Sequence, residues 1–196
     1  IYPQNMDFQE WAKAGYFQDM TGKDYLKRIK NNYAEKYAIN GKIYNVPLNA
    51  NVSGIYYNKT KFKELGLEEP KTFEEFQEIT KKIKDSGTSP FAVAGTEGWT
   101  LNGYHQLSLI TTTGSGDKAN DYLRFSKPNA IKATDPTLKE DAKKMDLLAE
   151  NAQNGWRGAS YNDAVVAFAN GKALMMPQGS WALAAVKQQD PKFEIG

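Results

Sequence analysis

The stretch Gly171–Trp181, GKALMMPQGSW, decides the fold class. Gly171 ends one predicted helix, a short apolar run follows, and Gly179-Ser180 opens a new helix with Trp181 as its second residue. A strand enclosed by helices is the repeating unit of an α/β sheet. Ligands of open α/β sheets bind outside the carboxyl ends of the strands, where this stretch would present an indole and free backbone N–H groups. Such a surface suits a sugar; the alternative is that the indole packs beneath its own helix.

The composition is that of an ordinary globular protein and excludes several classes. Of the 196 residues, 40% are hydrophobic and 24% are charged, and 25 basic residues are interleaved with 23 acidic ones. This balance argues against a nucleic-acid partner or an anionic membrane surface, because either would favour clustered Lys and Arg. The absence of Cys excludes disulfides, thiolate catalysis and Cys-ligated metals.

The chain shows neither a signal peptide nor an apolar run of the roughly 20 residues that span a bilayer. It begins at Ile1 in an apparent strand and stops at 193–196 in what looks like the start of another. We therefore expect a piece of a longer protein, with any membrane anchor outside this sequence.

Strands and helices alternate along most of the chain, which predicts an α/β protein with a largely parallel sheet. Thr72 and Glu75 have the spacing of a capping box, Asp135-Pro136 marks a helix start, and Ser160 precedes Asp163 by three residues. The predicted helices cover 7–14, 26–37, 59–65, 72–87, 101–113, a segment from 135, 160–170 and 180–189, and the predicted strands cover 42–46, 55–57, 91–94 and 172–176.

Four motifs, in the same order, resemble one known family. The pattern G-K-x-Y-x-V-P-L-x-x-N-x-x-G-x-x-Y-N-K at 41–59 is similar to the hinge region of extracellular solute-binding proteins of carbohydrate ABC importers. P-K-T-F-E-E-F at 70–76, F-A-N-G-K-A-L-M-M-P-Q-G-S-W at 168–181 and Y-P-Q-N-M-D-F at 2–8 resemble other parts of that family. Together they cover essentially the whole chain and resemble its family 1, the maltose- and multiple-sugar-binding-like proteins.

The resemblance implies the type II periplasmic-binding-protein fold, in which two α/β lobes, each a mostly parallel sheet flanked by helices, enclose a ligand. Residues 1–47 would be a partial N-lobe, 48–54 a hinge crossing and 55–196 the C-lobe. The family's first strand–helix–strand units and its C-terminal helices have no counterpart in this sequence.

The function implied is non-catalytic binding of a mono- or oligosaccharide in the interlobe cleft and its delivery to ABC permease subunits, without a cofactor or metal. The protein would be extracytoplasmic, either periplasmic or a cell-surface lipoprotein. One alternative is a glycoside hydrolase, which needs two catalytic carboxylates about 5 to 9.5 Å apart. Glu97 could be one of them, but the sequence offers no convincing second carboxylate. Another alternative is the same fold binding a polyamine, a metal or an anion instead of a sugar. An anion site would favour an Arg, and no Arg lies in a predicted cleft segment.

The candidate sugar contacts are aromatic platforms and groups that hydrogen-bond hydroxyls. Each has a structural alternative: the indoles could pack in the core, the Asn side chains could bond nearby backbone, and a loop carboxylate could simply be solvated. The only His, His105, is expected to be a hydrogen-bonded helix residue, and Trp11 and Trp156 are expected in the core. The predicted contacts are Trp99, Trp181, Asn5, Asn49, Asn51, Glu97, Gln178, Gly179 and Ser180.

Overall fold

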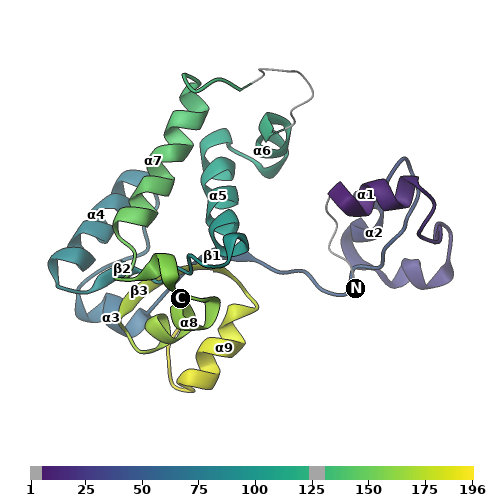
Figure 1. The fold of residues 1–196 in the computed structure, drawn as a ribbon. Helices are drawn as coiled ribbons and strands as arrows, with labels where there is room; N and C mark the ends of the chain where they lie inside the picture. Colours follow the sequence, from purple (N-terminus) through teal and green to yellow (C-terminus); the bar gives the residue numbers. More distant parts are fainter. Residues whose placement is uncertain (1–5, 124–130) are drawn as a thin grey trace. The chain divides into compact units, whose positions relative to one another are not determined.

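A computed structural model describes residues 6–123 and 131–196 (Figure 1). The chain divides into two compact units, Ile1–Ala50 and Asn51–Gly196, which are described separately below. Within the described residues, no helix is both long enough and apolar enough to cross a membrane.

The sheet of the second unit is built around β3 (Ala173–Gly179), with the strand order β1-β3-β2. β2 (Ser89–Phe91) pairs with β3 in parallel, whereas β1 (Ser53–Tyr57) pairs with it antiparallel, so that Ser53 lies opposite Gly179. The α/β class is confirmed. β2 pairs in parallel, as expected of a largely parallel sheet. β1 departs from that expectation: its partner β3 lies far later in the chain, and the apolar pattern of a strand does not indicate the direction in which it pairs.

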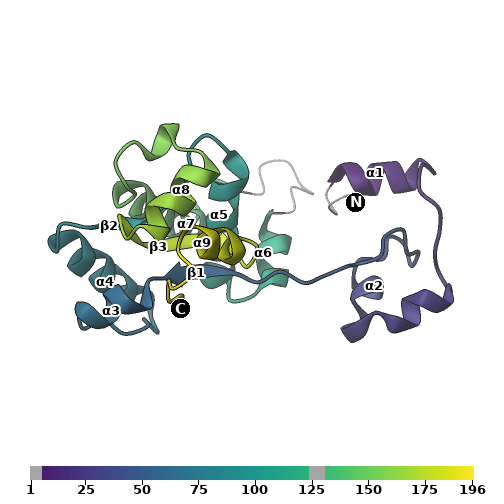
Figure 2. The same cartoon turned by 90° about the horizontal axis from the view of Figure 1, so that it is seen from below.

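Helices surround this sheet, and the three predicted start signals are confirmed. Thr72 and Ser160 each form a complete capping box with Glu75 and Asp163, and the Asp135 side chain accepts a hydrogen bond from the Thr137 N–H. In Figures 1 and 2 alike, α3 lies beside α4 and α8 beside α9. The helices are α3 (Lys59–Glu64), α4 (Phe73–Asp85), α5 (Gly98–Thr113), α6 (Gly116–Leu123), α7 (Pro136–Glu150), α8 (Tyr161–Ala169) and α9 (Ala182–Gln189), with a 3₁₀ turn at Trp156–Gly158.

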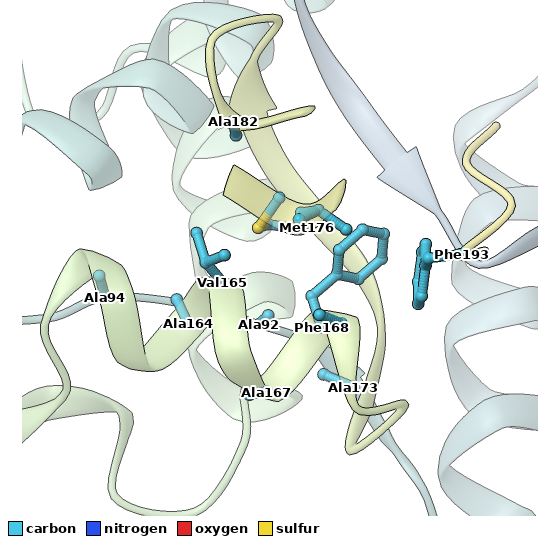
Figure 3. Close-up of a cluster of buried hydrophobic side chains, with 12 residues drawn as sticks. Ala92, Ala94, Ala164, Val165, Ala167, Phe168, Ala173, Met176, Ala182 and Phe193 are labelled. Atoms are coloured by element: carbon cyan, nitrogen blue, oxygen red, sulfur yellow. The ribbon is translucent and has the colours of Figure 1, made fainter. Parts of the chain in front are cut away.

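Every residue of β3 is buried, and the strand contributes to two apolar clusters. In the first, α8 and α9 pack on the strand, and the Phe168 ring faces the Phe193 ring at 4.9 Å between centroids (Figure 3). The second cluster joins β2 and β3 to α3, α4, α5 and α7 around Phe91 and Ile83. Burial on both sides explains why the β3 sequence is a continuous apolar run instead of an alternating one.

The first unit has less regular structure than the sequence predicts. The helix expected over 7–14 is present as α1 (Met6–Lys13). The helix expected over 26–37 is broken into two 3₁₀ turns (Asp24–Arg28 and Lys30–Asn32) and α2 (Tyr33–Lys36), because Asn31 and Asn32 adopt left-handed backbone conformations. The strand expected over 42–46 is absent: among the described residues, Lys42 forms only an isolated bridge to Ile39.

Candidate functional site

Two indoles meet at the carboxyl end of β3. Trp99 lies in the first turn of α5, and Trp181 directly precedes α9. Their ring centroids are 6.2 Å apart at an interplanar angle of 54°, and the residues are 49% and 44% exposed. Both indoles are therefore exposed at the end of the strand, as a ligand platform requires, and neither is buried in the core.

The neighbouring residues determine how these rings lie. A Cβ on Gly179 would overlap the Trp181 ring, so the glycine lets the indole cover the end of the strand. Trp99 also contacts the Tyr161 ring, at 5.3 Å between centroids. The Trp99 indole therefore has an aromatic neighbour on α8 as well as Trp181.

A cavity of about 190 Å³ opens beside the two indoles. Its lining residues include Gln178, Asn102 and Gln106, whose side chains are amides, and none of its lining residues has an ionisable side chain. Amides both donate and accept hydrogen bonds, whereas a buried charged ligand needs an opposite charge. The cavity is therefore suited to a neutral ligand with hydroxyl groups and apolar faces.

The structure brings four of the predicted contacts to this cavity: Trp99, Trp181, Gln178 and Gly179. Ser180 lies in the same turn, but its N–H donates to the Val52 carbonyl at 2.9 Å, and its hydroxyl accepts from the Val52 N–H at 3.3 Å. The N–H group expected to be free is thus used to anchor the segment that precedes β1.

The predicted Asn side chains have three different outcomes. Asn51 is exposed, and its Oδ1 accepts from the Ser180 hydroxyl at 3.5 Å. Asn49 is also exposed but belongs to the first unit, so the structure does not place it at this cavity. Asn5 lies outside the described residues.

Glu97 does not line the cavity. Its Oε2 accepts a hydrogen bond from the backbone N–H of Tyr161 at 2.5 Å, at the start of α8. Its backbone carbonyl accepts from the Thr100 N–H at 3.0 Å and from the Thr100 hydroxyl at 2.8 Å. One carboxylate oxygen that was expected to bind sugar hydroxyls is therefore engaged within the protein.

The sequence analysis missed Asn102 and Gln106. Both lie on α5, four residues apart and therefore on one face of the helix, and Trp99 lies three residues before Asn102. The helix itself was predicted over 101–113, so this spacing was the signal that could have identified them.

The other residues singled out in the sequence have structural roles. His105 is on α5, with its Nε2 2.9 Å from Asp141 Oδ2, as expected of a hydrogen-bonded helix residue. Trp156 packs on the second apolar cluster, and Trp11 lies against Phe17. In the part of the chain that the structure describes, no group of three or more acidic or His side chains is arranged to hold a metal ion.

A larger cavity of about 430 Å³ lies between α4, α5 and α7, and none of the predicted contacts lines it. Lys144 on its wall donates to the Thr111 and Thr112 hydroxyls at 2.9 and 2.8 Å, and burial lowers the pKa of its ammonium group. This Lys belongs to the α5–α7 packing and is separate from the indole cavity.

The second unit is thus an α/β sheet flanked by helices, with a cavity beside two exposed indoles at the carboxyl end of β3. The model of the bacterial extracellular solute-binding proteins matches residues 1–196, and the chain belongs to that family. This family implies an extracytoplasmic location.

Individual relatives agree with this membership. The chain is 68% identical over 198 residues to the multiple sugar-binding protein of Streptococcus mutans, covering 100% of the chain and 47% of the relative. It is 57% identical to RafE in complex with raffinose, with a TM-score of 0.91 over 100% of the chain and 52% of that structure. The apo form of RafE from Streptococcus pneumoniae has a TM-score of 0.86 over 100% of the chain and 51% of that structure. A more distant relative is the sn-glycerol-3-phosphate-binding periplasmic protein UgpB of Salmonella typhimurium, 27% identical over 81% of the chain and 36% of the relative. The chain spans about half the length of the nearer relatives.

Proposed function

We propose that this chain binds a neutral mono- or oligosaccharide at the cavity beside Trp99 and Trp181. The observation that carries the proposal is the composition of that cavity, which combines two exposed indoles with side-chain amides and has no ionisable lining residue. The identity to a multiple sugar-binding protein and the likeness to a raffinose complex support the same ligand class.

The chemistry of the cavity matches a sugar ring. The C–H faces of a pyranose are apolar and can lie on an indole, while its hydroxyls both donate and accept hydrogen bonds. Gln178 and Gln106 each offer both kinds of group. A neutral ligand also leaves no buried charge without a partner.

The protein that carries this chain delivers its sugar to the permease subunits of an ABC importer without changing it chemically. Residues 1–47 supply part of an N-lobe, 48–54 a hinge crossing and 55–196 the C-lobe. The protein is periplasmic or a cell-surface lipoprotein.

Two other classes are disfavoured by the same cavity. Hydrolysis of a glycosidic bond needs a pair of carboxylates, and the cavity wall has none. A polyamine site needs acidic groups around the ligand, and these are absent from the wall too.

Calorimetric titration of the full-length protein tests the proposal, with raffinose and a panel of neutral oligosaccharides as ligands and spermidine and sn-glycerol 3-phosphate as charged controls. At least one neutral saccharide should bind and be recovered intact after prolonged incubation. Such a ligand at 100 times its Kd should stabilise the folded protein by about 2.7 kcal/mol. Binding of only the charged ligands, or release of smaller sugars, would overturn the proposal.

A further inference from the structure

The loop that leads to Trp99 is fastened to the start of α8 by a row of hydrogen bonds. The Thr96 N–H and hydroxyl both donate to the Ala159 carbonyl, at 3.2 and 3.0 Å. One residue further on, Glu97 Oε2 accepts from the Tyr161 N–H at 2.5 Å. Gly95 continues the row, and a Cβ there would overlap the backbone of the facing segment. The loop and the helix start therefore form one rigid piece.

Tyr161 connects this piece to the ligand site. Its ring packs partly on the first apolar cluster, and its centroid lies 5.3 Å from that of Trp99 at an interplanar angle of 47°. The Glu97 carboxylate thus accepts a hydrogen bond from the backbone of Tyr161, and the ring of Tyr161 contacts the Trp99 indole. Glu97 itself has no place in the cavity wall.

We propose that Glu97 and Tyr161 are positioning residues, which together fix the Trp99 indole in the orientation that receives the ligand. The inference rests on the proposed sugar-binding function of the cavity. It differs from the sequence-based prediction, in which the Glu97 carboxylate accepts hydrogen bonds from the sugar itself. An indole that is held in place before binding loses less conformational freedom when a sugar stacks on it.

Substitutions at the two positions separate positioning from direct contact. Raffinose is the probe, and the full-length protein is titrated at a temperature where every variant is folded. Glu97→Ala should weaken binding roughly three- to tenfold, which corresponds to freeing one side chain. Glu97→Gln keeps an acceptor oxygen at the same reach and should bind like the parent. Tyr161→Phe should also bind like the parent, while Tyr161→Ala should match Glu97→Ala.

Asp163→Ala is the matched control for the stability of α8. The Asp163 carboxylate accepts from the Ser160 N–H and hydroxyl at the same helix start, and this substitution leaves the bond between Glu97 and Tyr161 intact. It should lower the melting temperature and leave raffinose affinity within twofold of the parent. An equal loss of affinity in Asp163→Ala and Glu97→Ala would show that Glu97 acts only by stabilising the start of α8, and it would overturn the proposal.

A measurement without sugar separates failure of the proposal from failure of the proposed function. Near-ultraviolet circular dichroism of the ligand-free protein reports the surroundings of the indoles, and Glu97→Ala and Tyr161→Ala should change it while Asp163→Ala should not. An unchanged spectrum in Glu97→Ala would overturn the positioning role whether or not any sugar binds. Loss of raffinose binding in Glu97→Gln but not in Tyr161→Ala would show direct contact and overturn it as well.

Discussion

Replacing Trp181 by Ala tests the ligand platform most directly. Trp181 is 44% exposed, which is about 90 Å² of a side chain of roughly 200 Å². At about 25 cal/mol per Å², a sugar that covers all of this surface gains about 2 kcal/mol, and one that covers half gains about 1 kcal/mol. We therefore expect Trp181→Ala to weaken sugar binding by roughly five- to thirtyfold.

The same substitution should affect stability only moderately. The buried part of the ring rests on Gly179 and near Trp99, so we expect a loss of about 1 to 2 kcal/mol, against about 3 to 5 kcal/mol for a Trp in a filled core. Calorimetric titration with raffinose and thermal melts of the same variant measure both quantities.

Trp156→Ala supplies the comparison, because Trp156 packs on the second apolar cluster and lines no part of the indole cavity. It should lower the melting temperature and leave the affinity within twofold of the parent. The reasoning is refuted if Trp181→Ala shows the behaviour expected of Trp156→Ala: a large loss of stability with unchanged affinity.

Three further substitutions test local features. Gly179→Ala should displace the Trp181 indole, which occupies the space of the added methyl group, and should weaken sugar binding with a changed near-ultraviolet spectrum. Thr72→Ala should cost about 0.5 to 2 kcal/mol of stability by removing a helix cap, with unchanged affinity in titration. The Tyr57 hydroxyl donates a hydrogen bond to Glu69 Oε1 at 2.6 Å, and this bond raises the pKa of Tyr57 from 10.0 to about 12. The bond therefore stabilises the fold below pH 10 and is lost as the pH rises towards 12. Glu69→Gln should return that pKa towards 10 in an absorbance titration of the phenolate.

Local signals in the sequence predict those parts of the fold that depend on neighbouring residues. The capping boxes at Thr72 and Ser160 are complete within three residues of sequence, and both appear where the spacing places them. The direction of β1 depends on its partner β3, more than 100 residues later, and hydrophobic alternation carries no information about it. The break in the helix at Asn31 and Asn32 could not be predicted from hydrophobic periodicity either, because these residues adopt left-handed backbone conformations without changing the apolar pattern.

The residues of the candidate site also differ in whether neighbouring sequence is enough to place them. Trp181 could be placed at a strand end from its own stretch of sequence, since Gly179 and the apolar run lie beside it. The spacing of Asn102 and Gln106 puts their amides on one face of the predicted helix, but that this face lines the cavity depends on how α5 is rotated about its axis against β3. The hydrogen bond from the Val52 N–H to the Ser180 hydroxyl joins residues 128 positions apart, and nothing in either stretch predicts it.

The fold alone does not determine the charge of the proposed ligand, so we infer a neutral sugar from the residues that line the cavity. UgpB is a relative at 27% identity whose name specifies a phosphate ester, whereas RafE, at 57% identity, has been seen with raffinose, which is uncharged. Removing a phosphate from water without a cation to meet it costs several kcal/mol even after relaxation. Among the described residues, none that lines this cavity carries a cation. Lys144 lines the space between α4, α5 and α7 instead, where it donates hydrogen bonds to two Thr hydroxyls. A phosphate in the indole cavity would meet amides, hydroxyls and indoles but no cation among the lining residues, so we expect the proposed site to reject a phosphate ester by the same groups that suit a sugar.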